Sequence, residues 1–240
     1  MNNSGLSRKI LIIIIFSFLF ARAVFSQDNP IYSNISGKPV STHWMFAQYS
    51  DSVTGYWSQL QSLPQQLYGV NAYYYSANNK VFICGGITQQ GAPQSNCYWY
   101  NIAANSYEPA VSLPHGRWSG KLVRVRDSLY LVGSVDSTFN SADGLIFKYS
   151  LSQNTWVISD TMPQPYLHEC AAAVINDSLI VTIGGSTGTF GNAVNYVRVF
   201  NPWNGNWTAS PSGFPVNNAT SHAECLKIDT AYNIIVVGGY

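Results

Sequence analysis

Charged side chains are scarce in this sequence, and neither sign dominates. Only 10% of the 240 residues are Asp, Glu, Lys or Arg, with 12 basic against 11 acidic side chains. Binding to nucleic acid or to an anionic membrane surface through charge needs a basic field, which this chain lacks. The sequence therefore predicts no nucleic-acid partner.

Long hydrophobic runs are also rare, and the one run present lies close to the first residue. It extends from Ile10 to Phe20 and is too short for a membrane-spanning helix, which needs roughly 20 residues. Basic residues precede it and small residues follow it: Arg8, Lys9, Ala21, Ala23 and Ser26. This order is typical of a secretory signal peptide over residues 1–26, cleaved after Ser26. The alternative is an uncleaved membrane anchor.

Cleavage would change the charge and the location of the protein. Loss of Arg8, Lys9 and Arg22 leaves 9 basic against 11 acidic side chains, a net charge near −2. No membrane span would remain. We expect a secreted, periplasmic or cell-surface protein.

Motifs of common catalytic and metal sites are missing. The chain has no Gly-x-Ser-x-Gly, no phosphate-binding loop, no Cys-x-x-Cys, no His-x-His and no His-Glu-x-x-His. The sequence therefore predicts no catalytic residue, no cofactor and no metal ion.

The chain has only four cysteines. Cys84 and Cys97 lie thirteen residues apart around a glycine-containing turn, so a disulfide within one hairpin is plausible in an oxidising compartment. Cys170 and Cys225 are interpreted as small buried residues.

Aromatic residues, by contrast, reach 14%, which suits an all-β domain. An apolar run that ends in a glycine pair, or in glycine followed by serine, occurs four times. Its first glycines are Gly85, Gly133, Gly184 and Gly238, separated by 48, 51 and 54 residues. This spacing indicates a structural repeat of about fifty residues.

Two further landmarks share the period. Tyr100, Tyr149 and Phe200 are each followed seven residues later by another aromatic residue: Tyr107, Trp156 and Trp207. A Leu-Pro-like pair then closes each unit at Pro64, Pro114, Pro163 and Pro215. The apolar run reads as a buried strand, and the aromatic residues would pack between stacked sheets. The glycines allow a positive φ and the close approach of a neighbouring sheet.

This combination resembles the kelch repeat, over roughly residues 45–240. Ser134 in place of a second glycine and Tyr107 in place of a tryptophan depart from the pattern. The resemblance implies an all-β fold, a kelch-type β-propeller of four-stranded antiparallel blades. It also implies an innermost strand before each apolar run, near Asn71–Tyr75, Gly120–Val125, Cys170–Ile175 and Cys225–Ile228.

The predicted domains are a signal peptide over residues 1–26, an N-terminal loop over 27–43 and the propeller over 44–240. The propeller would begin with strands Met45–Ser50 and Tyr56–Leu60, the third and fourth of a unit. These could close a four-bladed ring with the last two strands. We expect instead a fragment of a larger ring, with further C-terminal blades or domains.

Loops at the mouth of the central channel are the expected binding site, because the side chains of propeller strands pack against neighbouring blades and are not free to bind a ligand. The candidates combine rings for stacking with groups for directional hydrogen bonds: Arg117, Trp118, Tyr166, His168, Glu169, His222 and Glu224. Glu169-Cys170 and Glu224-Cys225 are interpreted as the same repeat position. His115, His168 and His222 differ in depth within the repeat, so a shared metal site is not predicted.

Three functions stay open. We expect a binding module for a protein or carbohydrate ligand rather than an enzyme. One alternative is a small-sugar enzyme of the kind that interconverts sialic-acid anomers, and another is a structural spacer in a surface protein. Galactose oxidase shares the kelch propeller in part, but its copper ligands have no match here.

Overall fold

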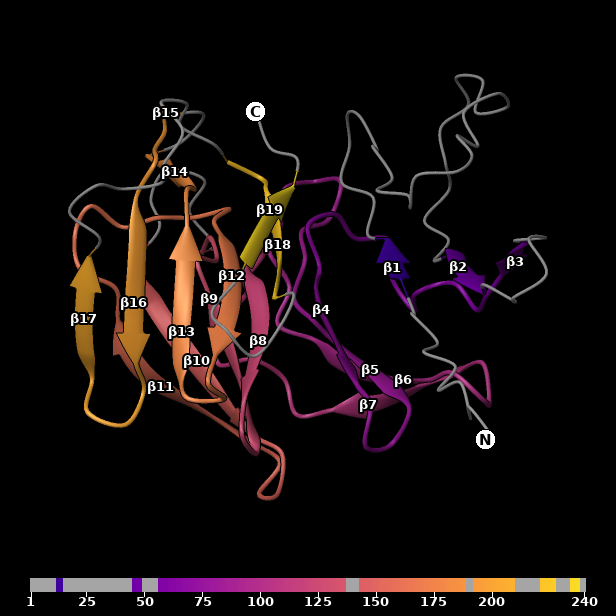
Figure 1. Cartoon of the computed structure of the whole chain (residues 1–240). Helices are drawn as coiled ribbons and strands as arrows, with labels where there is room; N and C mark the ends of the chain where they lie inside the picture. Colours follow the sequence, from indigo (N-terminus) through magenta and orange to yellow (C-terminus); the bar gives the residue numbers. More distant parts are fainter. Residues whose placement is uncertain are drawn as a thin grey trace, which may run out of the picture. The chain divides into compact units, whose positions relative to one another are not determined.

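Antiparallel β-sheets form the described part of the chain, which contains no helix (Figure 1). The structure is a computed structural model that describes residues 12–14, 45–48, 56–136, 143–188, 192–209, 221–227 and 234–237. The chain divides into two compact units, Met1–Gln66 and Leu67–Tyr240. None of the described residues forms a helix that could cross a bilayer. The predicted all-β class is confirmed.

The first unit contains a three-stranded sheet in the order β1-β2-β3. Its strands are β1 (Ile12–Ile14), β2 (Met45–Gln48) and β3 (Tyr56–Gln59). β2 and β3 coincide with the predicted strands Met45–Ser50 and Tyr56–Leu60. β1 lies in the predicted signal peptide. Cleavage of that peptide stays a prediction. β2 pairs with β1 and β3, in contrast to the ring closure considered from the sequence, which would pair these strands with β19. The predicted loop over residues 27–43 lies outside the described residues.

Three four-stranded sheets of the second unit are the predicted propeller blades. Blade 1 consists of β4 (Asn71–Tyr75), β5 (Lys80–Cys84), β6 (Cys97–Asn101) and β7 (Ser106–Ala110). Blade 2 consists of β8 (Lys121–Val125), β9 (Ser128–Val132), β10 (Leu145–Ser150) and β11 (Thr155–Thr161). Blade 3 consists of β12 (Ala171–Ile175), β13 (Leu179–Ile183), β16 (Val197–Asn201) and β17 (Asn206–Ala209).

Two smaller sheets accompany the blades. β14 (Ser186–Thr187) pairs with β15 (Asn192–Ala193) beside blade 3, and β18 (Glu224–Lys227) pairs with β19 (Ile234–Val237). The strands β4, β8, β12 and β18 begin within one residue of the predicted innermost strands. β4 lies beside β8, β8 beside β12, and β12 beside β18, as the inner strands of successive blades should.

Short hairpins join the first two strands of each blade. Arg126 and Asp127 alone connect β8 to β9, and Arg126 has a φ of 53°. The β12–β13 turn contains Asn176 and Asp177 with φ of 52° and 49°, the left-handed region that Asn and Asp tolerate better than most residues. We call these hairpin ends of the blades the turn end, and the opposite ends, where residues 111–120, 161–170 and 221–223 lead into inner strands, the loop face.

The core lies between blades, so an apolar strand packs on both of its faces. In β9 every residue is buried: Leu129 and Leu131 join a cluster with Phe82 of blade 1, while Tyr130 and Val132 join another with Phe200 of blade 3. Period-two alternation sends neighbouring side chains to opposite faces. On each face, the burial of apolar surface stabilises the fold by roughly 25 cal/mol per Å² removed from water.

The glycine after each apolar run permits this close stacking. Gly133 has a φ of 61°, and a Cβ there would lie 2.4 Å from the Cys170 Sγ of the next blade. Gly85 has a φ of 66°, and its Cβ would lie 2.1 Å from the Arg117 carbonyl oxygen. The predicted role of the glycine pair is confirmed at these positions.

Candidate functional site

On the loop face, one residue with positive φ precedes each inner strand by two positions. These residues are Gly69 (57°), Ser119 (53°), Glu169 (57°) and His222 (58°). The Ser119 N–H donates to the Gly69 carbonyl oxygen at 2.7 Å, and the His222 N–H donates to that of Glu169 at 2.9 Å. The four positions are therefore equivalent, and hydrogen bonds tie neighbouring loops together.

This equivalence corrects the predicted phase of Glu224. Glu224 is the first residue of β18 and corresponds to Ala171, so Glu169 is matched by His222 instead. The spacing grows from 50 residues, between Ser119 and Glu169, to 53 between Glu169 and His222. Glu224-Cys225 therefore does not occupy the same repeat position as Glu169-Cys170.

Glu169 lies between two imidazoles. Its Oε1 is 2.8 Å from His222 Nε2, and its Oε2 is 3.3 Å from His168 Nδ1. The Glu169 side chain is only 11% exposed, and that of His168 only 5%, whereas that of His222 is 32% exposed. His168 Nε2 also lies 2.5 Å from the Gly188 carbonyl oxygen. The structure thus brings together three of the predicted binding residues.

The two imidazoles favour the ionised form of Glu169. Burial alone would raise the pKa of its carboxyl, but the hydrogen bonds and charges of His168 and His222 outweigh burial and lower the pKa to about 2. Burial opposes protonation of His168, yet its contacts with Glu169 and Gly188 raise the pKa of its imidazole above the ordinary value. The cluster therefore holds an anion against at least one protonated ring in mildly acidic solution.

Ser221 extends this cluster in an order that resembles a hydrolase triad. Its hydroxyl lies 3.2 Å from His222 Nδ1, and His222 in turn contacts Glu169. A nucleophile must reach its substrate, however, and Ser221 has no exposed surface. The arrangement therefore holds the His222 ring in place rather than presenting a nucleophile.

Arg117 is buried, with only 1% of its surface exposed. Its guanidinium donates to both carboxylate oxygens of Asp143, at 2.9 Å and 2.5 Å, and lies 4.7 Å from the centre of the Phe147 ring. In this structure Arg117 therefore supports the loop instead of facing a ligand. Asp143 was not predicted, because its only signal in the sequence is a carboxylate in the loop after a glycine landmark.

Trp118 and Tyr166 are half-buried supports of the same loops. Trp118 forms a β-bridge with Val135, through backbone hydrogen bonds of 3.2 Å and 2.9 Å. The Tyr166 ring covers Gly144, where a Cβ would lie 2.6 Å from the ring. Both residues contact the loop that follows the Gly133 landmark.

Glu224 is the most exposed of the predicted residues, at 70% for its side chain. It forms an ion pair with Lys121, the first residue of β8. The pair reaches past β12, the inner strand between β8 and β18, where the equivalent residue is Ala171. Lys121 was not predicted, because only the fold brings residues 103 apart in sequence together.

The histidines do not form a metal site in the part of the chain that the structure describes. There, no three His, Cys, Asp or Glu side chains are grouped to hold a metal ion. His168 and His222 share Glu169, whereas His115 is exposed in the preceding loop.

Cys84 and Cys97 lie directly opposite each other on β5 and β6 as free thiols. The adjacent Gly85 N–H donates to the Asn96 carbonyl oxygen, so the cysteines occupy a non-hydrogen-bonded pair, where opposing side chains are closest. This position is compatible with the predicted disulfide, which stays a prediction.

A family model matches part of the chain. A family model described as the Kelch motif matches residues 169–213, a segment that begins at Glu169 and includes blade 3.

Two curated proteins resemble most of the chain. Kelch-like protein 35 of Mus musculus is 24% identical over 186 residues, 76% of this chain and 29% of that protein. Kelch repeat and BTB domain-containing protein 6 of Homo sapiens is 23% identical over 205 residues, 84% of this chain and 26% of that protein. The chain thus spans less than a third of the length of either relative.

Among solved structures, that of YjhT is similar, with a TM-score of 0.68 and 13% identity. The match covers 83% of this chain and 67% of that chain. At this identity the similarity concerns the fold.

Proposed function

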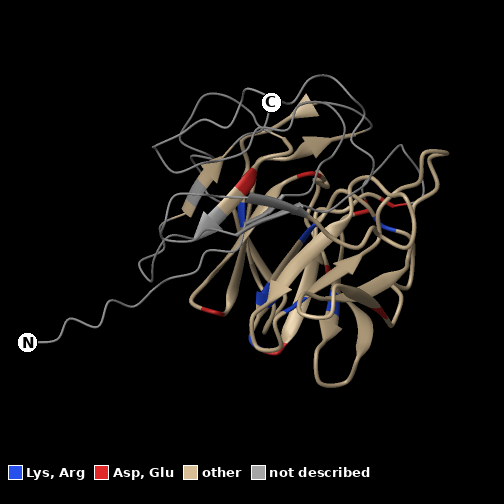
Figure 2. Cartoon of the chain, turned by 90° about the vertical axis from the view of Figure 1, so that its right-hand side faces the viewer, with Lys and Arg blue, Asp and Glu red and all other residues tan. Residues whose placement is uncertain are grey.

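The chain is a kelch-repeat β-propeller, and from that premise we propose that it is a binding module that holds a protein partner at its loop face. The surface involved consists of Lys121, His222 and Glu224. Kelch repeats are typical of protein-interaction propellers, and exposed loops on a rigid scaffold are the usual place for recognition. Charged residues are sparse and of both signs in the described part of the chain (Figure 2).

One observation carries the proposal: Glu169, the nearly enclosed carboxylate of the loop face, is already engaged by His168 and His222, whereas the Glu224 side chain is 70% exposed. The pKa of Glu169, near 2, makes it a poor proton donor or acceptor at neutral pH, since catalytic groups work best when their pKa lies near the operating pH. Arg117 is buried against Asp143. The exposed Lys121–Glu224 pair remains available for a partner.

The sugar-enzyme alternative has less support. It would need a carboxylate or imidazole that faces an enclosed space for a small substrate, and Glu169, which is nearly enclosed on the loop face, is bound by His168 and His222. A spacer role is a further outcome, which the binding experiment below distinguishes.

Export forms part of the proposal. The support is the order of residues in the first 26 positions. Amino-terminal sequencing of the protein isolated from its own host would test it: a mature chain that begins near Gln27 is expected. A chain that retains Arg8 and Lys9 would contradict it.

The binding function can be tested with two charge reversals of matched type. Glu224→Arg breaks the loop-face pair with Lys121, and Glu108→Arg breaks the Lys80–Glu108 pair between β5 and β7 of blade 1. Proteins captured from host extracts by the wild-type chain would be identified, purified and titrated. Loss of a few kcal/mol at an interface charge predicts at least about tenfold weaker binding for Glu224→Arg and no change for Glu108→Arg.

Three results would contradict the proposal. Equal binding by both variants would place the partner elsewhere, and absence of any partner would favour a spacer. Exchange of N-acetylneuraminate anomers by the wild-type chain, lost in Glu224→Gln, would make the protein an enzyme.

A further inference from the structure

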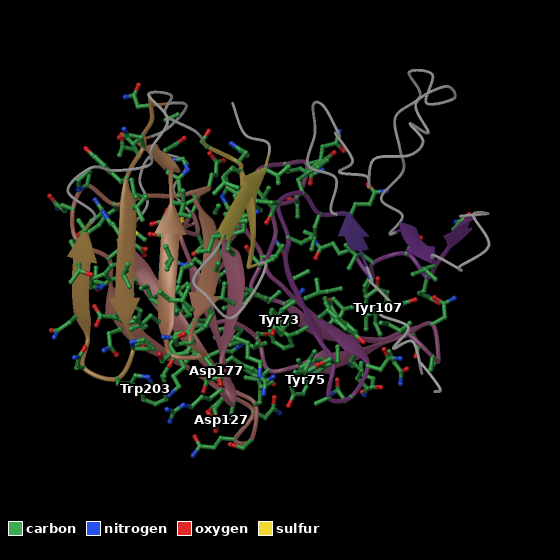
Figure 3. The ribbon with its side chains drawn as sticks, in the orientation of Figure 1. Tyr73, Tyr75, Tyr107, Asp127, Asp177 and Trp203 are labelled. Carbon is green, nitrogen blue, oxygen red and sulfur yellow. The ribbon has the colours of Figure 1, made fainter. Side chains whose placement is uncertain are left out.

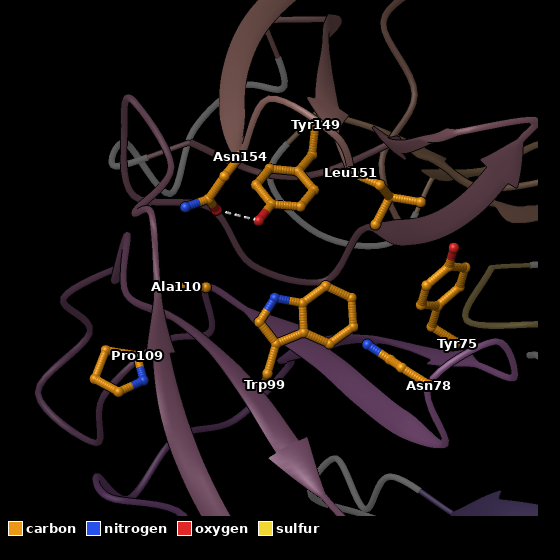
Figure 4. Close-up of a pocket in the computed structure, with 8 residues that line it drawn as sticks. All are labelled: Tyr75, Asn78, Trp99, Pro109, Ala110, Tyr149, Leu151 and Asn154. Atoms are coloured by element: carbon orange, nitrogen blue, oxygen red, sulfur yellow. Dashed lines mark hydrogen bonds between the residues drawn. The ribbon is translucent and has the colours of Figure 1, made fainter.

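A second candidate site lies between blades 1 and 2, separate from the loop face. It is a cavity of about 290 Å³ lined by Tyr75, Asn78, Trp99, Pro109, Ala110, Tyr149, Leu151 and Asn154 (Figure 4). Blade 1 provides the first five of these residues, and blade 2 the last three. Tyr75, Asn78, Leu151 and Asn154 belong to the turn end, opposite the Lys121–Glu224 pair.

The lining combines aromatic rings with amides and contains no Lys, Arg, Asp or Glu. The Trp99 indole lies at the centre, with the Asn78 amide beside it and the Tyr149 hydroxyl facing it (Figure 4). Burial raises the pKa of Tyr149, so its hydroxyl stays neutral at physiological pH. Such a cavity favours a neutral ligand that offers both an apolar face and hydroxyl groups.

The polar groups of the cavity are the Tyr149 hydroxyl and the amides of Asn78 and Asn154. The Tyr149 hydroxyl donates to Asn154 Oδ1, which leaves the amide nitrogen of Asn154 without a partner among the described residues. Asn78 is exposed in the β4–β5 turn, and within the described residues its amide makes no hydrogen bond. The cavity thus presents two amides with unused hydrogen-bonding capacity.

The aromatic rings of the cavity, those of Trp99 and Tyr75, are fixed by contacts with neighbouring side chains. Phe82 packs against Trp99 with ring centres 4.8 Å apart, and the Tyr75 ring lies 6.0 Å from that of Trp99. The Arg124 guanidinium lies 5.0 Å from the centre of the Tyr75 ring. A stacking surface that is already ordered loses little entropy when a ligand binds.

The repeat itself does not produce this cavity. At the equivalent crevice between blades 2 and 3, Val125 replaces Tyr75, Lys148 replaces Trp99 and Phe200 replaces Tyr149. Gly205 stands in place of Asn154 there. The aromatic and amide groups are therefore specific to the crevice between blades 1 and 2.

The turn end of the second crevice is also closed. The Arg126 guanidinium lies 4.4 Å from the centre of the Trp203 ring, and the Arg126 N–H donates to Asp177 at 3.1 Å. Trp203 and Asp177 lie at the same end of the molecule as Tyr75 (Figure 3). Ser152 takes the place of Trp203 in blade 2, so no ring covers the first crevice.

We propose that this cavity binds one unit of a neutral saccharide, which stacks on Trp99 and hydrogen-bonds to the Asn78 and Asn154 amides. The volume suits a single sugar unit, with the rest of a chain outside. A proline-containing peptide also favours aromatic grooves, but it needs a surface long enough for several residues, whereas this open pocket of about 290 Å³ is lined by eight residues with amides at its edges.

The test uses the whole chain and defined probes: cellobiose, chitobiose and a proline-rich decapeptide, measured by calorimetry and by saturation-transfer NMR. Binding of at least one disaccharide in the millimolar range is expected. Asn78→Ala should weaken it about fivefold or more, the effect of one lost hydrogen bond. Ser76→Ala, in the same turn but outside the cavity, should leave it unchanged.

A second variant fills the cavity without removing any polar group. Ala110→Leu should abolish saccharide binding while the urea midpoint stays near that of the wild type, and Glu224→Arg should have no effect on it. The proposal is overturned if neither disaccharide binds, if Ala110→Leu binds normally, or if only the peptide binds. The loop-face function can fail independently, because Glu224 lies at the other end of the blades.

Discussion

Arg117 occupies a loop position that the other blades fill with leucine. Each of Leu67, Arg117 and Leu167 precedes the residue that forms the loop's β-bridge, and all three are almost fully buried. A buried cation is tolerated only when it is paired. The two hydrogen bonds to Asp143 and the contact with the Phe147 ring provide that pairing.

Removal of Asp143 should therefore lower the free energy of unfolding more than removal of Arg117. Asp143→Ala leaves the Arg117 charge buried and unpaired, and we expect a loss of about 3 kcal/mol in the free energy of unfolding. Arg117→Leu restores the residue of the other blades and leaves a carboxylate that is 30% exposed, so a loss below about 1.5 kcal/mol is expected. Urea unfolding of both variants measures the difference. Equal losses would show that Arg117 is not a buried charge in solution.

The sequence identified Arg117 as functional because of its chemistry, and the structure explains why chemistry alone misleads at this position. Nothing in the sequence marks the Leu67 and Leu167 positions as buried loop sites, and Asp143 lies 26 residues away. Glu169 and His222, by contrast, come together on the loop face, and their role in binding stays a prediction.

At the scale of elements, three hairpins at the turn end share one contact. A tyrosine hydroxyl near the end of a strand donates to the side chain of an asparagine five residues later: Tyr74–Asn79, Tyr100–Asn105 and Tyr149–Asn154. The three asparagines have φ of 55°, 49° and 53°. Each therefore serves both as a left-handed turn residue and as the acceptor that closes the hairpin.

These two roles can be separated in the β6–β7 hairpin. Asn105→Gly keeps the left-handed backbone and loses the hydrogen bond from Tyr100, so we expect a loss of about 1 kcal/mol. Asn105→Ala also strains the backbone and should lose roughly 2 kcal/mol. Thermal unfolding of both variants and the wild type provides the measurement. If alanine is tolerated as well as glycine, the turn relaxes to negative φ.

The sequence predicted these elements well, because each strand and turn is specified locally. The apolar runs and the kelch resemblance placed the first two strands of blades 1 to 3 to within a residue or two. The phase of Glu224 was wrong, because the chain before β18 is three residues longer than before β12. The residue pattern of a strand predicts where that strand lies, but it does not predict the length of the preceding loop.

At the scale of the whole molecule, the fold follows from the repeat and the special sites follow from departures from it. Stacked clusters such as Phe82 with Leu129 and Leu131 come from residues at repeated positions, and the kelch resemblance implies them. The cavity at Trp99 and the Lys121–Glu224 pair depend on residues that differ between blades. Such sites become visible only once the blades are placed side by side.

The Glu169 cluster joins the loop of blade 3 to the loop before β18, so its ionisation should affect the stability of the assembled array. The pKa of Glu169 is lowered to about 2, and the stabilisation it gives is therefore present above the ordinary pKa of 4.5 and lost as the pH falls towards 2. The pKa of His168 is raised, so its contribution is present below the ordinary value of 6.5 and lost as the pH rises through the folded-state value.

The two limits together predict that this cluster stabilises the protein most between about pH 4.5 and 6.5, by at most about 3 kcal/mol. Urea midpoints of the wild type and Glu169→Gln, measured from pH 3 to pH 8, test this window. Because other groups titrate in both proteins, the difference between the two curves isolates the cluster. That difference should be largest near pH 5.5 and should shrink on both sides; a constant difference would mean that Glu169 acts through packing and hydrogen bonds rather than through its charge.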